Sequence, residues 1–225
     1  MKALIIAAGH GSRLRSVSPS KPLTPVAGIP LIAHVIRAAA AGGATSFRVV
    51  TGHEAARLEA FLATLTEYAI DTVRVADWDL PNGHSVAAGA AGLDGDWLLM
   101  MSDHLFDPEI VRRLIAAPPA GLTLAVDRDL SGPMLDIDDA TKVATEGGAI
   151  RRIGKSLADY DAVDCGLFRA GPALAEALGP GGSLSDGVQR LADRGEAGVA
   201  DVTGLKWLDV DDPVALAKAE AWLGV

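Results

Sequence analysis

The chain has 225 residues, of which 49% are hydrophobic, and a formal net charge of −9. This length fits a single domain with a sizeable core, and the acidic balance argues against general binding to nucleic acid or to an anionic membrane surface. With one cysteine, Cys165, a disulfide framework is excluded and a reducing, cytoplasmic location is expected. The apolar runs are too short to predict a transmembrane helix, and the N-terminal MKALIIAAG predicts a buried strand instead of a secretory signal.

Apolar runs alternate with helical patterns through the first half of the chain. Buried strands are expected at 2–7, 47–51, 72–76 and 97–102. Helices are expected at 30–41, 54–64, 85–92 and 108–116, and Asp107 is expected to cap the last of them. Alternation of this kind implies right-handed crossovers. The sequence therefore predicts an α/β fold, with a Rossmann-like, mostly parallel sheet covered by helices on both faces.

The second half of the chain is richer in strand patterns. Strands are expected at 121–126, 162–169, 199–203 and 206–210, and a hairpin over 142–153 is expected to turn at Gly147-Gly148. Helices are expected at 184–194, where Ser183 is the cap, and at 213–223. No linker separates the two halves. We therefore expect one domain over 1–225, in which the second half completes the sheet and adds a small β-rich lid.

The loop after the first strand, AAGHGSRLRSVSPSKPL at 7–23, combines glycines with basic side chains. A strand that ends in G-x-G presents free backbone N–H groups to an anion, although a glycine-rich turn with solvated basic residues is the alternative. A dinucleotide fingerprint would need a third glycine, where Leu14 stands here, and an acidic residue after the second strand, which ends VTG. The Walker pattern G-x-x-x-x-G-K-[ST] is absent. Neither of these two motifs explains the loop.

A third pattern fits both the loop and the segment after it. G-x-G-S-R-L is followed by K-P-L at 21–23 and by PVAGIPLI at 25–32. This arrangement resembles the signature of the sugar-nucleotidyltransferase superfamily, MobA-like enzymes that join a nucleoside triphosphate to a phosphomonoester and release pyrophosphate. The resemblance implies the nucleotide-diphospho-sugar transferase fold. It further implies an NTP-binding half at 1–118 and an acceptor-binding half at 119–225, whose C-terminus completes a metal site.

The resemblance assigns the opening loop to the nucleotide. Glycines there let the backbone approach the triphosphate, Arg13 offers a planar fork of donors to the β and γ phosphates, and Lys21 places a charge near the α-phosphate. The segment Asn82-Gly83-His84-Ser85, expected to be a loop, would meet the base and ribose, although N-G is also an ordinary turn signal. The expected nucleotide-binding residues are Ala8, Gly9, Gly11, Ser12, Arg13, Lys21, Asn82, Gly83, Ser85 and Asp103.

Carboxylates that follow two of the strands are expected to hold Mg²⁺. Asp103, in MMSDHLFD, ends a buried central strand, where α/β sheets place ligand chemistry, and carboxylate oxygens suit this hard cation. Asp209 matches the superfamily's second metal aspartate best and Asp211 is close behind, whereas Asp212 is expected to cap the last helix. His104 either assists in phosphate binding or is only a packed neighbour.

Contacts to the acceptor are expected from the second half. Lys155, in RRIGK, aligns loosely with a lysine that holds the acceptor's phosphate, with a surface lysine as the alternative. Asp164 and Gly166 lie on a strand where relatives contact the acceptor, and Cys165 between them is expected to be a buried filler, because nucleotidyl transfer needs no thiol. Asp186 is a weaker candidate, since compensation of a helix dipole would also explain it. The expected catalytic residues are Arg13, Lys21 and Lys155.

Within the superfamily, the chain most resembles the CTP:inositol-1-phosphate cytidylyltransferases. The segments that carry this resemblance are NGHSV at 82–86, LLMMSDHLFD at 98–107, LDIDDATKV at 135–143, RRIGKSLADYDAVDCGLF at 151–168 and LKWLDVDDPVALAKAE at 205–220. The resemblance implies Mg²⁺-dependent transfer of CMP from CTP to inositol 1-phosphate. Cys165 stands where the family has threonine, so phosphocholine, 2-aminoethylphosphonate and a sugar 1-phosphate stay open as acceptors. A nucleotide-binding module without catalysis is a remote alternative.

In that family the domain is often fused to a membrane-embedded CDP-alcohol phosphotransferase. This chain ends at Val225 without such a segment. We therefore expect a stand-alone form without membrane insertion, which hands its product to a separate membrane enzyme. The sequence does not indicate an oligomeric state.

Overall fold

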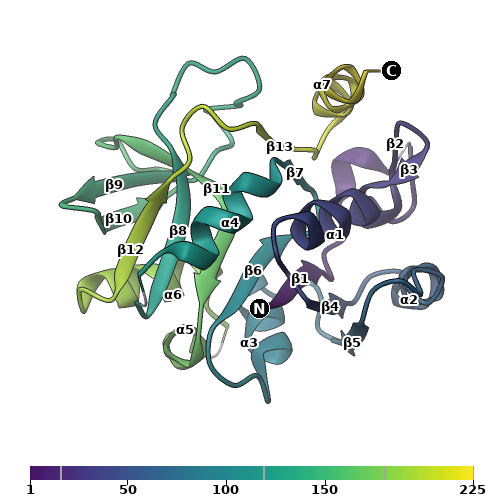
Figure 1. Ribbon diagram of the computed structural model, residues 1–225, viewed down its shortest axis with the longest axis horizontal. Helices are drawn as coiled ribbons and strands as arrows, with labels where there is room; N and C mark the ends of the chain where they lie inside the picture. Colours follow the sequence, from purple (N-terminus) through teal and green to yellow (C-terminus); the bar gives the residue numbers. More distant parts are fainter. Residues whose placement is uncertain (16, 119, 180, 225) are drawn as a thin grey trace.

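In the computed structural model, which describes residues 1–15, 17–118, 120–179 and 181–224, nine strands form one continuous sheet (Figure 1). In spatial order they are β5 (Ile70–Arg74), β4 (Ser46–Thr51), β1 (Lys2–Ala7), β6 (Trp97–Met101), β11 (Ala162–Ala170), β8 (Leu122–Asp127), β12 (Ala197–Asp201), β10 (Ala149–Gly154) and β9 (Lys142–Glu146). The first four are parallel to one another, whereas β11 runs antiparallel to both of its neighbours. The α/β fold is confirmed, and the antiparallel strands of the second half make its sheet mixed.

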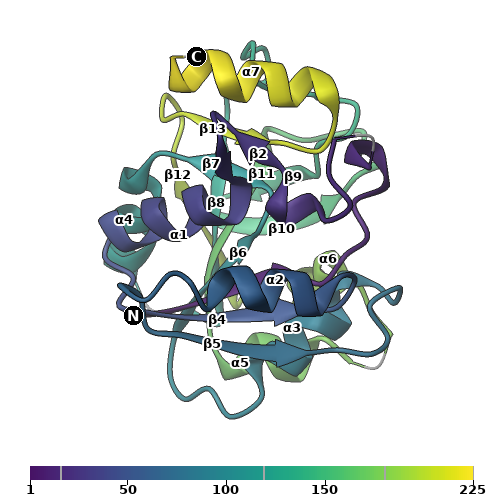
Figure 2. The same cartoon turned by 90° about the vertical axis from the view of Figure 1, so that its right-hand side faces the viewer.

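Helices cover both faces of the sheet (Figures 1 and 2). On one face lie α1 (Leu31–Ala41), α2 (Ala55–Leu62) and α4 (Pro108–Ala116), and on the other lie α3 (Asn82–Ala90), α5 (Pro172–Ala177) and α6 (Leu184–Asp193). Successive residues of β1 alternate between the two cores: Ile5 packs with the first set and Ile6 with the second. Burial on both faces explains why this strand is an uninterrupted apolar run.

A third, smaller cluster closes one end of the molecule. It lies under α7 (Pro213–Leu223), beside two short antiparallel ribbons: β2 (Pro25–Val26) with β3 (Ile29–Pro30), and β7 (His104–Phe106) with β13 (Trp207–Asp209). Figure 2 shows α7 lying across this end, above β13 and β7. The longest helices, α1 and α7, have 11 residues each, so no helix in the described part of the chain could cross a bilayer.

Most predicted elements are present, with ends that move by one to three residues. The caps predicted at Asp107, Ser183 and Asp212 each accept a backbone N–H, and the hairpin turns at Gly147-Gly148 as expected. One assignment was wrong: 82–85 is not a loop but the first turn of α3. Glycine is required at position 83 by close packing on the chain before α6, because a Cβ would lie 2.3 Å from the carbonyl oxygen of Gly182.

Candidate active site

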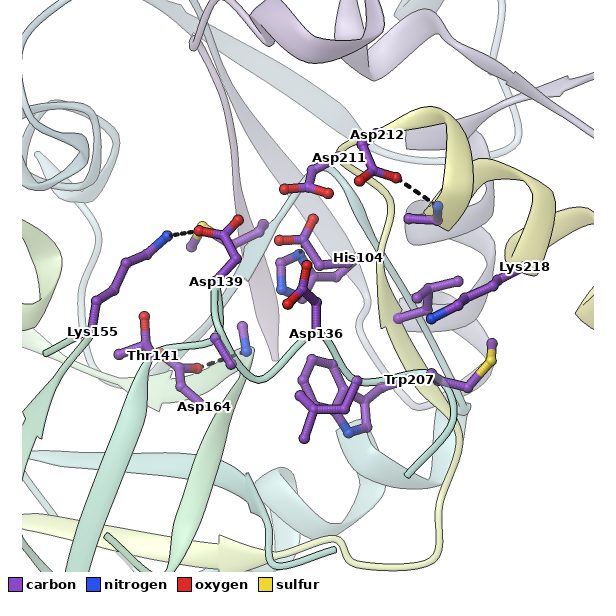
Figure 3. A pocket seen from close by; sticks show the side chains of 18 of the residues that line it. His104, Asp136, Asp139, Thr141, Lys155, Asp164, Trp207, Asp211, Asp212 and Lys218 are labelled. Carbon is purple, nitrogen blue, oxygen red and sulfur yellow. Dashed lines mark hydrogen bonds and ion pairs between the residues drawn. The ribbon is translucent and has the colours of Figure 1, made fainter. Parts of the chain in front are cut away.

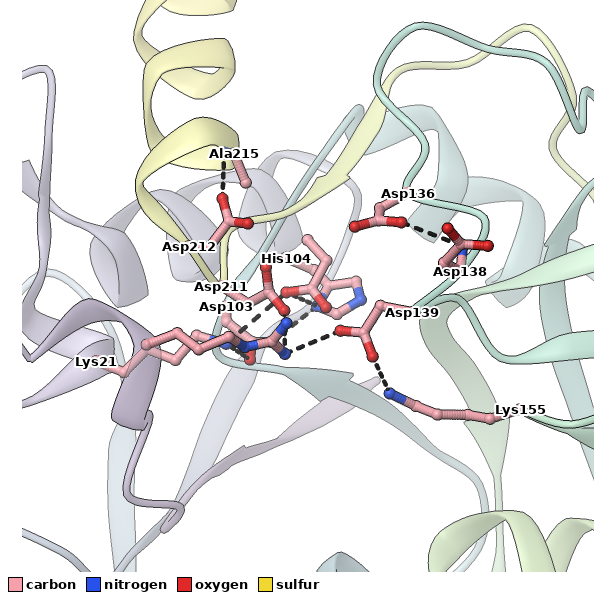
Figure 4. Close-up of polar contacts among 12 residues, drawn as sticks. Lys21, Asp103, His104, Asp136, Asp138, Asp139, Lys155, Asp211, Asp212 and Ala215 are labelled. Atoms are coloured by element: carbon pink, nitrogen blue, oxygen red, sulfur yellow. Dashed lines mark hydrogen bonds and ion pairs between the residues drawn. The ribbon is translucent and has the colours of Figure 1, made fainter.

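The β7–β13 ribbon brings together two carboxylates that are more than a hundred residues apart in sequence. Asp103 directly precedes β7, and within the ribbon His104 pairs with Asp209. The Val210 N–H donates to the Asp103 carbonyl oxygen at 2.8 Å, which extends the pairing by one residue. Both carboxylates therefore lie beyond the carboxyl end of β6, at the edge where α/β sheets place ligands. Figure 4 shows the acidic groups converging there from separate segments.

Lys21 reaches this carboxylate pair from a 3₁₀ turn over Lys21–Leu23. Its Nζ lies 2.6 Å from Asp103 Oδ2 and 3.8 Å from Asp209 Oδ1. Burial alone would lower the pKa of Lys21, but the carboxylates outweigh it and raise that pKa above its usual value. Lys21 and a hydrogen bond from His104 likewise hold the pKa of Asp103 far below its usual value in spite of burial. The site thus holds a fixed ammonium against ionised aspartate.

Gly11 has a structural role beside this lysine. Its φ is +58°, and a Cβ there would lie 2.3 Å from Cβ of Lys21. Glycine at this position is therefore required by the close approach of the Lys21 side chain and by the left-handed backbone. At Gly9, by contrast, an added Cβ would meet none of the described residues within 4 Å. Of the two glycines, only Gly9 leaves the open space that was expected beside a triphosphate.

The donor set beside Lys21 fits a divalent cation. Single oxygen or nitrogen atoms of Asp103, His104 and Asp209 all lie within 4.8 Å of one another. Asp209 Oδ1 is buried and has no hydrogen-bond partner among the described residues, and an atom of this kind is costly unless something pairs with it. Burial, together with the nearby charge of Asp103, raises the pKa of Asp209 to about 6. A cation held by Asp103 and Asp209 would satisfy the orphaned oxygen and favour the ionised form.

Asp139 forms ion pairs with both Arg13 and Lys155; Figure 4 shows its carboxylate beside the Lys155 ammonium. Arg13 Nη2 lies 2.8 Å from Asp139 Oδ2, and Lys155 Nζ lies 2.5 Å from Asp139 Oδ1. These contacts hold the pKa of Asp139 well below its usual range. Arg13 also forms an ion pair with Asp211. Asp211 therefore faces the arginine of the opening loop, while Asp209 is the residue placed next to Asp103.

A cavity of about 200 Å³ opens beside these groups (Figure 3). Its lining includes Lys155, Asp164 and Gly166, which were expected to contact the acceptor. Asp164 Oδ1 accepts the Gly166 N–H at 2.7 Å, and burial raises the pKa of Asp164 to about 6. Cys165 is buried, as expected of a filler, and its burial raises the pKa of the thiol well above the usual value.

Four further residues line the cavity or bridge its charges and were not predicted: Asp136, Asp139, Trp207 and Lys218. Asp136 and Asp139 belong to LDIDDATKV, a segment that carried the family resemblance but received no role of its own. Lys218 lies on α7, where the pattern of the last helix gives no sign that one face borders a cavity. These residues could be recognised only from which side chains lie near them in space, and a single sequence does not contain that information.

Several predicted nucleotide contacts have other partners in this structure. Asn82 Oδ1 accepts the Leu184 N–H at 2.9 Å. Ser85 is only 4% exposed, so little of it could contact a nucleotide. The carbonyl oxygen of Ala8 accepts the backbone N–H of His53 at 2.9 Å. The Ser12 side chain lies outside the described part of the structure. Contact of this segment with a base stays a prediction. Among the described residues, the amide nitrogen of Asn82 has no hydrogen-bond partner and Gly9 borders open space.

Asp186 is placed differently from the acceptor-binding prediction. Its Oδ2 accepts both the backbone N–H and the hydroxyl of Ser183 at 2.8 Å, which forms a capping box at the start of α6. Asp186 is absent from the described lining of the cavity, although its neighbours Leu184 and Ser185 are present. The alternative explanation, stabilisation of a helix N-terminus, accounts for this residue.

We expect Asp186→Ala to lower the free energy of unfolding by about 1 kcal/mol, because it removes one arm of the capping box. Urea unfolding measures this change. The KM for the acceptor should stay within twofold of the wild-type value. Asp193→Ala in the last turn of the same helix is the comparison: it removes a hydrogen bond from Gln189 at 2.8 Å but no cap, and it should destabilise the protein less than Asp186→Ala. A large rise in acceptor KM with unchanged stability would restore the acceptor-binding role.

Comparison with known proteins gives a consistent result. The family described as MobA-like NTP transferase domain matches residues 3–142. The bifunctional IPC transferase and DIPP synthase of Rubrobacter xylanophilus is 37% identical over 227 residues, which cover 97% of this chain and 51% of that protein. The CMP-5'-(3-aminopropyl)phosphonate synthase of Streptomyces rubellomurinus is 34% identical over 240 residues, covering 95% of this chain and 37% of that protein.

Among solved structures, the inositol-1-phosphate CTP transferase from T. maritima superposes with a TM-score of 0.86 at 21% identity, covering 97% of this chain and 96% of that one. At this identity the likeness shows the fold. The chain spans about half the length of the curated bifunctional relatives that it matches.

Proposed function

Because this chain belongs to the MobA-like NTP transferase family, a family of nucleotidyltransferases, we propose that it transfers CMP from CTP to inositol 1-phosphate and releases pyrophosphate. The observation that carries the proposal is the buried Lys21 ammonium, held 2.6 Å from Asp103 and 3.8 Å from the orphaned oxygen of Asp209. A fixed cation beside a candidate metal site is the arrangement needed to neutralise charge that develops on a phosphoryl group.

The proposed division of labour follows from where each side chain lies. Asp103 and Asp209 would hold Mg²⁺, which when bound acts as a Lewis acid on phosphate oxygens. Lys21 lies against both carboxylates and would stabilise the negative charge on the α-phosphoryl oxygens. Arg13, on the loop that follows β1, would bind the β and γ phosphates of the leaving group through its planar fork. The first 118 residues supply most of these groups, which supports their assignment as the NTP-binding half.

Lys155 would hold the phosphate of the acceptor, because it lies at the cavity wall and shares the Asp139 carboxylate with Arg13. In-line attack on the α-phosphorus requires little covalent chemistry from the protein. Asp139 stands where phosphate oxygens of both substrates would otherwise contact Arg13 and Lys155. When the substrates bind, their phosphates would replace the Asp139 carboxylate as partners of Arg13 and Lys155. The positive charge of each side chain would stay compensated.

The choice of inositol 1-phosphate rests on the family resemblance of the sequence segments and on the carboxylates that line the cavity. Within the described residues, Asp136 and Asp164 line it without an ion pair. Carboxylate oxygens accept hydrogen bonds and would bind the hydroxyls of a polyol. The corresponding CDP-alcohol product would serve a membrane phosphotransferase, as a separate protein or as a further part of a longer one.

One observation favours a second acceptor class, an aminoalkylphosphonate. The same two unpaired carboxylates, with the Trp207 ring beside them, would also suit a primary ammonium group. The 34% identity with the aminopropylphosphonate enzyme covers nearly the whole of this chain. The two acceptor classes differ in the charge of the group that would meet Asp136 and Asp164.

Pyrophosphate release tests the proposal directly. Each of the four nucleoside triphosphates is combined with Mg²⁺ and with inositol 1-phosphate, phosphocholine, 2-aminoethylphosphonate or glucose 1-phosphate. We expect the highest kcat/KM for CTP with inositol 1-phosphate. Highest turnover of CTP with 2-aminoethylphosphonate would establish the second acceptor class. A preference for UTP or dTTP with glucose 1-phosphate would refute the cytidylyl assignment and leave the family assignment intact.

A further inference from the structure

His104 is a buried ring that is clamped on two sides. It is 8% exposed, and its ring is nearly parallel to that of Trp207, with 6.2 Å between centroids and 11° between planes. On another side lies Gly166 of β11, where an added Cβ would be 2.5 Å from Cδ2 and 2.6 Å from Nε2 of His104. The Nε2 edge of the ring therefore lies on the Gly166 side, where only glycine leaves room for it. Trp207 is itself fixed, since its Nε1–H donates to Asp127 Oδ2 at 2.9 Å.

The other ring nitrogen is engaged as well. Nδ1 lies 2.8 Å from Asp103 Oδ1. Asp103 Oδ2 already accepts from the Lys21 ammonium at 2.6 Å, and a carboxylate in such a pair is an acceptor, so Nδ1 donates the hydrogen of this bond. Its lone pair is then unavailable to a cation. Nε2 faces the backbone of Gly166, so neither nitrogen can act as a ligand unless the ring moves out of its clamp.

The clamp also determines the orientation of Asp103. The His104 Nδ1–H holds Oδ1, and the Lys21 ammonium holds Oδ2 at 2.6 Å, so each oxygen of the carboxylate has its own hydrogen-bond donor. His104 Nδ1 is also 3.9 Å from Asp209 Oδ1. One ring thus lies within reach of both candidate metal carboxylates and is hydrogen-bonded to the first.

From this arrangement we propose that His104 is a positioning residue that orients the Asp103 carboxylate for a divalent cation, and that it is not itself a ligand of that cation. The proposal rests on the proposed function, because it presumes that Asp103 and Asp209 hold the metal. Hydrogen-bonding partners of metal ligands typically change metal affinity by about 10- to 100-fold when they are removed. His104 has the contacts of such a partner.

Three substitutions at His104 distinguish a residue that positions Asp103 from a ligand of the cation. His104→Asn keeps an N–H donor near the position of Nδ1, His104→Gln moves the donor toward the position of Nε2, and His104→Leu removes it while filling similar space. Affinity for Mn²⁺ as a spin-active substitute for Mg²⁺ is measured by electron paramagnetic resonance, with CTP present. We expect His104→Asn to bind Mn²⁺ within threefold of wild type, and the Gln and Leu variants to bind about 10- to 100-fold more weakly.

A spectroscopic measurement on the wild-type protein examines the ring itself. The ¹⁵N resonances of the His104 ring are followed during titration with Mg²⁺ and CTP. The Nδ1-bound hydrogen should persist at saturation, because it remains in the bond to Asp103. Loss of that hydrogen, or a ligand-type shift of either nitrogen, would show direct coordination and overturn the proposal.

His34→Asn is the control for a part-buried histidine bond, since His34 Nε2 contacts the Val26 carbonyl oxygen at 2.9 Å away from the carboxylates. It should leave Mn²⁺ affinity unchanged, and thermal unfolding of every variant shows whether the fold is retained. Failure of folded His104→Asn to bind Mn²⁺, with wild-type binding intact, overturns this inference alone. Failure of wild type to bind the metal refutes the proposed metal site and this inference together. A wild type that binds metal but releases no pyrophosphate refutes only the proposed reaction.

Discussion

Lys21→Ala is expected to reduce kcat/KM at least about 100-fold, which corresponds to about 2.7 kcal/mol of transition-state stabilisation. The ammonium is buried between Asp103 and Asp209, so its removal leaves carboxylates without their counter-charge and withdraws the cation proposed for the α-phosphoryl oxygens. Steady-state pyrophosphate release with CTP and inositol 1-phosphate measures the effect. The loss should appear mainly in kcat, because the charge is needed most in the transition state.

Two further variants make this result specific. Lys21→Met keeps most of the apolar stem that packs on Gly11 and should lose activity to the same extent while folding normally. Lys2→Ala is the control for a lysine in an ion pair elsewhere, since Lys2 contacts Asp71 at 2.8 Å at the far end of β1. It should change kcat/KM less than twofold. Near wild-type turnover of folded Lys21→Met would contradict the proposed mechanism.

Asp103→Ala is expected to lose at least about 100-fold in turnover as well, and the isosteric Asp103→Asn should lose a similar amount. Either substitution removes a charged oxygen donor from the candidate cation site and breaks the bond that neutralises Lys21. The apparent affinity for Mg²⁺ should fall together with the rate, and raising the Mg²⁺ concentration should recover part of the activity. Rates measured as a function of Mg²⁺ at saturating CTP test both expectations.

Asp107→Asn provides the comparison for Asp103, because it changes the same side chain only four residues away. Asp107 caps α4 by accepting the Glu109 N–H at 2.8 Å, and asparagine is an equally good cap. We expect its activity to stay within twofold of wild type. If the Asp103 variants kept full activity at low Mg²⁺, the carboxylate pair would have no role in catalysis.

The elements that the sequence predicted well are those determined by local rules. The first strand is an unbroken apolar run because both of its faces are buried, and α4, α6 and α7 begin at cap residues that bond to their own backbone. Apolar runs and helix caps involve only residues that are close together in the sequence, so the sequence contains all the information needed to predict them. The α/β fold, the hairpin and the membership of a nucleotidyltransferase family could all be predicted from them and from the motifs in chain order.

The features that the sequence did not predict depend on contacts with residues that lie far away in the chain. β7 has three residues and exists because it pairs with β13, which lies about a hundred residues later. The N-G pair at the start of α3 is a local turn signal, whereas Gly182, on which Gly83 packs, belongs to another segment. A glycine in the opening loop was likewise expected to leave room for phosphate, whereas at Gly11 that room is filled by Lys21.

For the candidate site, the sequence by itself determined which chemical groups are present: the glycine loop, Arg13, Lys21 and the aspartates at 103 and 209. Only the tertiary structure decided how they are paired. It placed Asp209 beside Asp103 and turned Asp211 toward Arg13, it used Asp186 as a helix cap, and it clamped His104 between Trp207 and Gly166. The physical reason is that residue identity fixes charge and hydrogen-bonding capacity locally, whereas the partner of each charge is set by strand pairing and packing between segments far apart in the chain.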